Sequence, residues 1–200
     1  MQIFKYLSLG LLFATKLQAA WYDDVRLGQP EYGGTGCPAG SAAVALSPDA
    51  KSVSILFDQF VTEAGGSTGR SLDRKTCNIA VPVHVPSGYS VSIFQIDYRG
   101  FNSLPYGAYS VFSVEYFFAG TQGPTYQKRF DGHLESNYLL HNQVAASAYA
   151  WSDCGSSVIL RANTGMMVKT NGQKQSAMST VDSADISSGL LFNLQWRRCN

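Results

Sequence analysis

Charged residues are scarce in this chain: Asp, Glu, Lys and Arg make up 14% of its 200 residues, whereas about 25% is usual. The 15 Lys and Arg nearly balance the 14 Asp and Glu, which leaves a formal charge of +1 at pH 7. Without a broad positive field to gather phosphates, the chain lacks the main affinity term of nucleic-acid binding. Its 12% aromatic residues and mere 7 Pro also exclude intrinsic disorder.

Long apolar runs are missing too, since a helix that crosses a bilayer needs about 20 residues. The apolar stretch Tyr6–Ala14 is much shorter; it follows Lys5 and precedes the small residues Ala19 and Ala20. This pattern predicts a secretory signal peptide over residues 1–19, and no Cys follows the cleavage point to carry a lipid. We therefore expect a mature protein outside the cytoplasm, secreted or periplasmic, without membrane insertion.

Cysteine pairs at metal-ligand spacing are absent, and no Cys has a His within four positions, so neither zinc nor any other cofactor is expected. Export makes disulfides the default state of the thiols, and four cysteines allow three pairings. A long cysteine-free middle favours one N-terminal and one C-terminal bridge, with the other pairings still open. In the chain-entropy treatment, each bridge contributes about 4 kcal/mol. The favoured bridges are Cys37–Cys77 and Cys154–Cys199.

Helical periodicity is almost missing, and alternation with a period of two replaces it. Apolar residues occupy every second position from Cys77 to Val85, which is typical of a strand with one buried face. About ten short strands at a spacing of roughly 8–12 residues predict an all-β fold, a single-domain antiparallel β-sandwich. The other predicted strands are Ser41–Leu46, Ser52–Phe57, Tyr89–Tyr98, Ser110–Phe118, Thr125–Phe130, Ala146–Trp151, Ser157–Arg161, Gly165–Thr170, Ala177–Val181 and Gly189–Arg197.

The sandwich is expected to occupy residues 33–200, behind a leading segment at 20–32. Residues 137–149 fit either one short helix or a strand. Asn171-Gly172 lies between two predicted strands and suggests a hairpin.

The segment from Phe101 to Tyr109 has the aromatic residues of greatest functional interest, because it places rings in a turn-rich loop beside strand ends. Exposed rings stack on sugars or anchor protein partners, whereas buried ones would cap the core. We predict a binding site at Phe101, Tyr106 and Tyr109. Trp151 and Trp196 adjoin cysteines and are expected to pack around a disulfide.

Several patterns raise the alternative of a hydrolase. Gly65-Gly66-Ser67-Thr68-Gly69 matches the Gly-x-Ser-x-Gly signature, but no helical pattern follows it, so a surface loop is favoured. Acid–base catalysis on a glycoside needs two carboxylates across a cleft. The candidates for that pair are Asp97, Glu115, Asp131 and Glu135, with Asp97 and Glu115 on neighbouring predicted strands.

Three further polar features have ordinary structural explanations beside their functional ones. His84 alternates away from the apolar face of its strand and is predicted to face solvent. His133 lies between Asp131 and Glu135, a grouping that fits a metal ligand, a proton-transfer site or a polar turn. The motif Asp182-Ser183-Ala184-Asp185 fits calcium or, more readily, a hydrogen-bonded turn.

Several short motifs lie in order over nearly the whole mature chain. They are Gly36-Cys37-Pro38, Val85-Pro86-x-Gly88-Tyr89, Tyr98-Arg99-Gly100, Tyr116-Phe117-Phe118-x-Gly120, Trp151-Ser152-x-Cys154-Gly155, Val181-Asp182-Ser183-x-Asp185 and Gln195-Trp196-Arg197-x-Cys199. With these motifs the chain resembles the secreted family catalogued as domain of unknown function 4360. That resemblance implies a secreted, disulfide-bearing β protein and supplies no catalytic or binding residues.

From the sequence, the leading hypothesis is a non-enzymatic module that binds carbohydrate or another cell-surface ligand. The alternative is a hydrolase that acts on extracellular polysaccharide.

Overall fold

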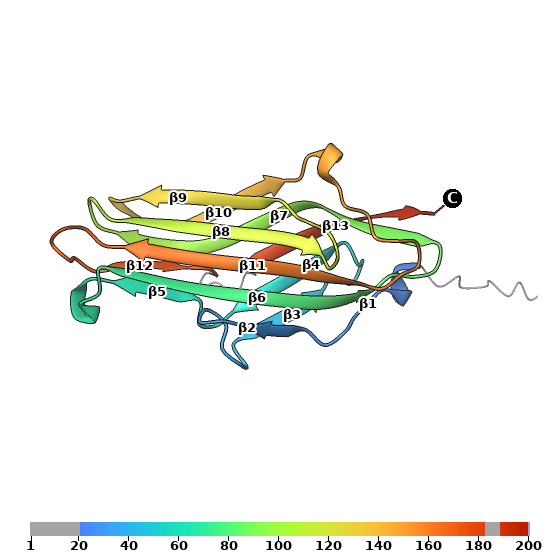
Figure 1. Cartoon of the computed structure of the whole chain (residues 1–200), viewed down its shortest axis with the longest axis horizontal. Coiled ribbons are helices and arrows are strands. Elements are labelled where there is room, and N and C mark those ends of the chain that lie inside the picture. Colours follow the sequence, from blue (N-terminus) through green and yellow to red (C-terminus); the bar gives the residue numbers. More distant parts are fainter. Residues whose placement is uncertain (1–20, 183–188, 200) are drawn as a thin grey trace, which may run out of the picture.

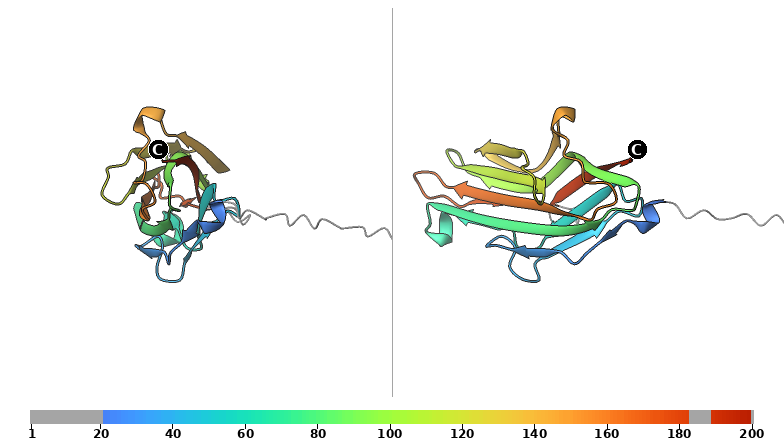
Figure 2. Two further views of the ribbon diagram at one scale, coloured as in Figure 1. Left: turned by 90° about the vertical axis from the view of Figure 1, so that its right-hand side faces the viewer. Right: turned by 45° about the vertical axis from the view of Figure 1, so that its right-hand side comes forward.

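Two antiparallel sheets face each other and enclose one core in this computed structural model, which describes residues 21–182 and 189–199 (Figure 1). The predicted signal peptide lies outside the described residues. Seen end-on, the strands surround a common interior (Figure 2). The predicted all-β sandwich is therefore confirmed.

The first sheet, sheet A, is built around the long strands β6 and β11, which pair along their whole length. Its order is β1-β6-β11-β8-β9, and β2 also pairs with β6. Its strands are β1 (Arg26–Leu27), β2 (Glu31–Gly33), β6 (Leu72–His84), β8 (Tyr109–Phe118), β9 (Thr125–Asp131) and β11 (Val158–Lys169).

The second sheet, sheet B, is built around β7, which pairs with β10 on one side and with β13 and β12 on the other. Its order is β3-β4-β13-β7-β12-β5, with β10 off this path. Its strands are β3 (Ala42–Leu46), β4 (Ser52–Phe57), β5 (Val61–Ala64), β7 (Tyr89–Leu104), β10 (Leu134–Gln143), β12 (Ala177–Thr180) and β13 (Leu190–Arg198). Three short 3₁₀ turns complete the described elements: η1 (Trp21–Asp24), η2 (Gly66–Thr68) and η3 (Ala146–Ala148).

The core lies between the sheets and follows from the alternation in the sequence. Every second residue of β8 is buried, and Phe112 is fully enclosed. Ile96 and Phe192 face it from sheet B and are equally inaccessible. Burying a side chain of this size stabilises the fold by about 1.5–3 kcal/mol. Successive residues of a strand point to opposite faces, so the remaining positions form the outer faces of the sheets.

Both predicted disulfides are present. Cys37–Cys77 is completely buried and joins the loop before β3 to β6. Cys154–Cys199 joins the segment after η3 to the end of β13, and Cys154 is exposed. The bridges thus attach one loop segment to each sheet. Trp196 packs against the core and donates its Nε1–H to the Ala50 carbonyl at 2.8 Å.

Tertiary pairing changes four local expectations. Within residues 137–149, those up to Gln143 belong to the strand β10, because their backbone pairs with β7, whereas Ala146–Ala148 form η3, so the strand predicted at Ala146–Trp151 is wrong. The two strands predicted between Ser157 and Thr170 are one strand, β11. Asn171-Gly172 is not a hairpin turn: β11 belongs to sheet A and β12 to sheet B, so this connection crosses between the sheets. In the predicted leading segment, β1 and β2 already pair with β6.

Candidate functional site

The three aromatic residues predicted to bind ligand lie in three different places. Because β7 continues to Leu104, Phe101 belongs to a strand and projects from the outer face of sheet B, opposite Asn137 of β10. Tyr106 occupies the turn between β7 and β8 and is 83% exposed. Tyr109 begins β8 and projects from the outer face of sheet A. The fold does not gather these three rings on one surface.

The Tyr109 ring already has a partner. The Arg129 guanidinium lies 3.7 Å from its centroid, and Arg129 Nε donates to Asp131 at 2.8 Å. A cation above one face of a ring occupies the surface on which a sugar would stack. Tyr106 is the more accessible ring, and its carbonyl accepts a hydrogen bond from Asn171 at 2.8 Å, which ties the turn to the β11–β12 connection.

The proposed acid–base carboxylates do not meet across a cleft. Asp97 projects from the outer face of sheet B, whereas Glu115 projects from the outer face of sheet A and accepts a hydrogen bond from Asn163 at 3.0 Å. These two candidates lie on opposite sides of the sandwich. Asp131 forms an ion pair with Arg129 at 2.8 Å, and Glu135 is exposed on β10.

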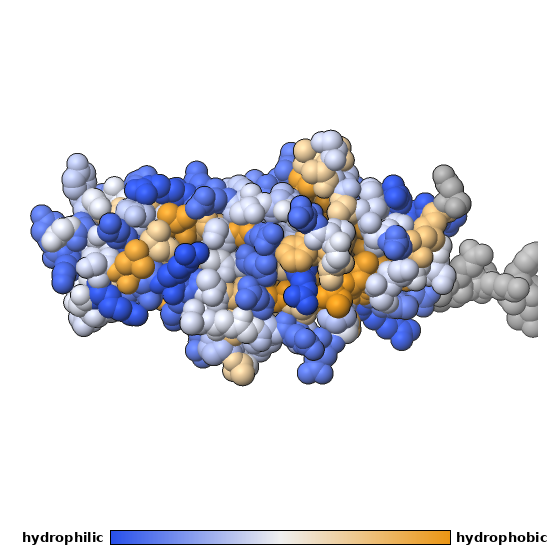
Figure 3. All heavy atoms as spheres, viewed as in Figure 1, coloured by the Kyte–Doolittle hydropathy of each residue, from blue (hydrophilic) through white to orange (hydrophobic). Residues whose placement is uncertain are grey.

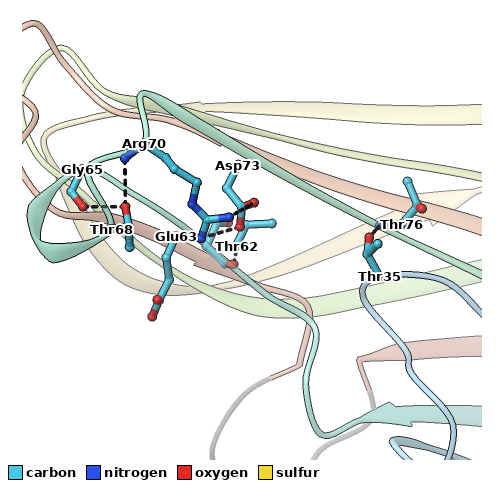
Figure 4. Close-up of polar contacts among 9 residues, drawn as sticks. Thr35, Thr62, Glu63, Gly65, Thr68, Arg70, Asp73 and Thr76 are labelled. Carbon is cyan, nitrogen blue, oxygen red and sulfur yellow. Dashed lines mark hydrogen bonds and ion pairs between the residues drawn. The ribbon is translucent and has the colours of Figure 1, made fainter.

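The Gly-x-Ser-x-Gly segment is a turn between two strands and not a strand-to-helix elbow (Figure 4). Thr68 Oγ1 donates to the Gly65 carbonyl at 2.7 Å. Arg70 continues this network by donating to Asp73 at 3.0 Å, and Asp73 also accepts the Glu63 backbone N–H at 3.1 Å. Ser67 itself is exposed. These contacts shape a loop and provide no activated nucleophile.

The remaining polar motifs are also accounted for by local structure. His84 faces solvent as predicted and is 3.1 Å from the Ser157 hydroxyl. His133 is exposed in the turn between β9 and β10. Asp182 accepts the Phe57 backbone N–H at 3.0 Å, while Ser183–Asp185 lie outside the described residues. Within the part of the chain that the structure describes, no three His, Cys, Asp or Glu side chains are grouped to hold a metal.

The outer face of sheet B has a polar cluster that the sequence did not reveal. Its centre is Asp97, whose neighbours in β7, Ile96 and Tyr98, are both fully buried in the core. Asp97 points the other way, yet it is only 8% exposed. Three side chains cover and hydrogen-bond its carboxylate: His141 Nδ1 at 2.7 Å, Gln95 Nε2 at 2.8 Å and Asn193 Nδ2 at 3.1 Å. We call these four residues the outer polar cluster.

Burial alone would raise the pKa of Asp97, but the hydrogen bonds from His141, Gln95 and Asn193 outweigh it and lower that pKa below its usual range. The carboxylate is therefore ionised at neutral pH and holds three donors in fixed orientations. The His141 side chain remains 59% exposed. Among the residues described, only Asp97 forms a hydrogen bond with His141, so no serine, threonine or cysteine there is activated by this imidazole.

Apolar side chains flank the outer polar cluster on the same face. His141 pairs with Asp97, Leu139 with Arg99 and Asn137 with Phe101, so on this face each apolar side chain lies beside a polar one of the neighbouring strand. Leu139 is 50% exposed and Phe101 is half-buried. Asp97 and Phe101 are four residues apart in an extended strand, which is about 13 Å. The face thus combines oriented polar groups with an aromatic ring.

The outer face of sheet A carries a mixture of hydrophobic and hydrophilic side chains. Figure 3 views the molecule from the side of sheet A, where hydrophobic groups are interrupted by hydrophilic ones. Between the sheets, an apolar cavity beside Tyr116, Phe118 and Val144 measures about 30 Å³. This is room for one or two water molecules and not for a sugar. The outer polar cluster with Phe101 is therefore a better candidate site than this cavity.

The two sheets and two sulfur bridges define a secreted, disulfide-bonded β-sandwich. The chain belongs to the family described as "Domain of unknown function (DUF4360)", which it matches over residues 23–199. A protein of Arthroderma benhamiae named "Uncharacterized secreted protein" is 29% identical over 178 residues, which cover 88% of this chain and 73% of that protein. In the described residues, every helix is too short or too polar to span a bilayer.

Proposed function

We propose that this protein is a non-catalytic carbohydrate-binding module and that its binding surface is the outer face of sheet B. The observation that carries the proposal is the ionised Asp97 carboxylate, which is buried on the solvent side of the sheet under three side chains that it orients. Sugar hydroxyls are recognised by oriented amide, imidazole and carboxylate groups beside an aromatic ring. The polar groups adjoin one another on this face, and Phe101 lies about 13 Å from Asp97 along the same strand.

Each residue has a distinct part in this proposal. Asp97 is a positioning residue, because its oxygens already accept three hydrogen bonds. The groups left to contact a sugar are His141 Nε2 and the amide oxygens of Gln95 and Asn193, which accept no hydrogen bond from any described residue. Phe101 supplies the apolar surface on which a ring would stack.

The test is a glycan array followed by affinity measurement with the mature, disulfide-intact protein. Phe101→Ala is expected to weaken binding by about two- to tenfold, because stacking on an aromatic ring is worth roughly 0.5–1.5 kcal/mol. The matched control is Phe117→Ala, which removes a half-buried ring from β8, on the opposite sheet. We expect this variant to bind as the wild type does.

Two further variants distinguish a binding site on the outer face of sheet B from one at the turn that contains Tyr106. His141→Ala is expected to weaken binding and also to lower the melting temperature by a few degrees, because it removes one of the three hydrogen bonds to the buried Asp97 carboxylate. Tyr106→Ala tests the exposed turn. Loss of binding in Tyr106→Ala together with full binding in Phe101→Ala and His141→Ala would move the site from sheet B to the turn. Absence of binding to every glycan would reject the carbohydrate class itself.

A further inference from the structure

A polar hollow lies at the end of the molecule where β7 starts and β13 ends. It is an open depression of about 440 Å³, which is within the size range of small-ligand sites. The Cys154–Cys199 bridge forms part of its wall. The lining residues are Ser90, Ser152, Asp153, Cys154, Arg197, Arg198 and Cys199.

Backbone hydrogen bonds join the segments around this hollow to the start of β7 and to the residue before it. The Cys199 N–H donates to the Gly88 carbonyl and the Gly155 N–H donates to the Tyr89 carbonyl, both at 2.8 Å. Ser152 also exchanges hydrogen bonds with Val91, through its N–H at 2.9 Å and its hydroxyl at 3.0 Å. Together with the disulfide, these bonds hold the walls of the hollow in place without a ligand.

Two arginines in the wall are oriented by aromatic rings. The Arg197 guanidinium lies 4.1 Å from the centroid of the Trp151 ring. Arg198 Nε donates to the Tyr89 hydroxyl at 3.2 Å. Neither arginine forms an ion pair with an acidic side chain among the described residues. The lining contains these two arginines and one acidic residue, Asp153.

We propose that this hollow binds the carboxylate or sulfate group of an acidic polysaccharide. A guanidinium group has a planar set of donors that matches an oxyanion with two parallel hydrogen bonds, and stacking on a ring leaves the edge with those donors available. The assignment of the anion to a carbohydrate rests on the proposed function. Trp151 and Arg197 flank β7, whose outer face also presents Asp97 and Phe101, so one extended polymer can reach both sites.

The first experiment is an NMR titration of the mature protein with inorganic sulfate at constant ionic strength. The amides of Trp151–Gly155 and Arg197–Cys199 are expected to shift saturably. Arg197→Gln and Arg198→Gln are each expected to weaken this binding at least about tenfold, because a charge-assisted hydrogen bond contributes roughly 1.5–3 kcal/mol. Arg197→Lys keeps the positive charge but lacks the planar pair of N–H donors, so this variant should bind sulfate more tightly than Arg197→Gln and more weakly than the wild type. The control is Arg161→Gln, an exposed arginine of sheet A.

The second experiment compares polygalacturonate, dextran sulfate and neutral dextran as ligands. We expect the two acidic polymers to bind more tightly than the neutral one, with the difference lost in the double variant R197Q/R198Q. Equal weakening by R161Q, or unchanged binding in both arginine variants, would overturn the site. Sulfate binding with no preference for acidic polymers would overturn its assignment to a polysaccharide and leave a free-anion site.

The two proposals fail in different ways. If acidic and neutral polymers bind equally and only Phe101→Ala weakens them, the outer face stands and the anion site is rejected. If acidic polymers bind through Arg197 and Arg198 while Phe101→Ala has no effect, the anion site stands and the outer face is rejected.

Discussion

At the scale of the residue, Asp97 combines two features that seldom coincide: it belongs to the solvent side of a sheet and yet is almost inaccessible. Three hydrogen bonds compensate the burial of its charge and lower its pKa. A group with a lowered folded-state pKa contributes stability above its unfolded pKa of about 3.9 and loses that contribution as the pH falls through its folded value. Lowering the pH through this range should therefore weaken the hydrogen bonds that hold the outer polar cluster together.

Asp97→Asn is predicted to destabilise the protein by about 1–3 kcal/mol at pH 7, because hydrogen bonds to a charged group are lost. The difference from the wild type should begin to shrink as the pH falls below about 4, the pKa of the unfolded chain, and should be smallest once the pH has passed the lower folded-state pKa, where the folded wild-type carboxyl is protonated as well. Urea unfolding at a series of pH values from 2 to 7 measures this. A difference that stays constant over the whole series would contradict the role given to the ionised carboxylate.

Gly100 shows how close packing limits a single position. A Cβ at this residue would overlap the Thr180 carbonyl oxygen and the hydroxyl end of the Tyr138 ring. Tyr138 is fixed there, because its hydroxyl donates to the same carbonyl at 2.7 Å. We predict that Gly100→Ala lowers stability by about 1–3 kcal/mol through overpacking. Thermal unfolding measures this loss of stability. The control is Gly69→Ala, where a Cβ would meet open space but the backbone is left-handed, so that its destabilisation reports backbone strain without steric overlap.

At the scale of the element, β7 and β11 are paired on both sides, whereas β9 forms an edge of sheet A with mostly exposed side chains. Amide exchange should follow this arrangement. We expect the slowest amides in β7 and β11, with opening free energies near that of global unfolding, and the fastest strand amides in β9. Native-state hydrogen exchange read by NMR tests the order. Slow exchange throughout β9 would show that another element or a second copy covers that edge.

Strand patterns could be predicted from local alternation, and β3, β4 and β8 lie close to their expected ranges. The residues from Asn137 to Gln143 were ambiguous, because Leu139 and Leu140 are consecutive apolar residues and interrupt the period of two. Backbone pairing with β7 makes this segment a strand and places the His141 side chain beside Asp97. Such pairing is non-local, since 44 residues separate these partners. The candidate site therefore could not be assembled from sequence patterns.

At the scale of the whole molecule, the two disulfides close loops of similar length, with separations of 40 and 45 residues. Chain entropy alone predicts about 4 kcal/mol for each. Their surroundings differ, because Cys37 and Cys77 are fully buried whereas Cys154 is exposed. Replacing the buried pair by alanine also leaves a poorly filled space in the core, which adds to the loss.

We therefore predict that C37A/C77A is less stable than C154A/C199A, and that a mild dithiol reduces Cys154–Cys199 before Cys37–Cys77. Calorimetry of both variants and mass spectrometry after partial reduction and alkylation measure the two effects. The reverse order in either experiment would show that the bridge at the end of β13 is the stronger constraint.

The sequence by itself determined the class of fold and most of the residues that enter the core, because alternation is a local pattern, and it favoured the two sulfur bridges over the other pairings without deciding between them. Only the tertiary structure decided which strands are neighbours. Because of the strand order, Phe101, Tyr106 and Tyr109 lie in three different places, and Asp97 and Glu115 lie on opposite faces of the sandwich. The same order places His141 beside Asp97. The physical reason is that alternation sets the face on which a side chain lies, whereas sheet order and register set the residue beside it.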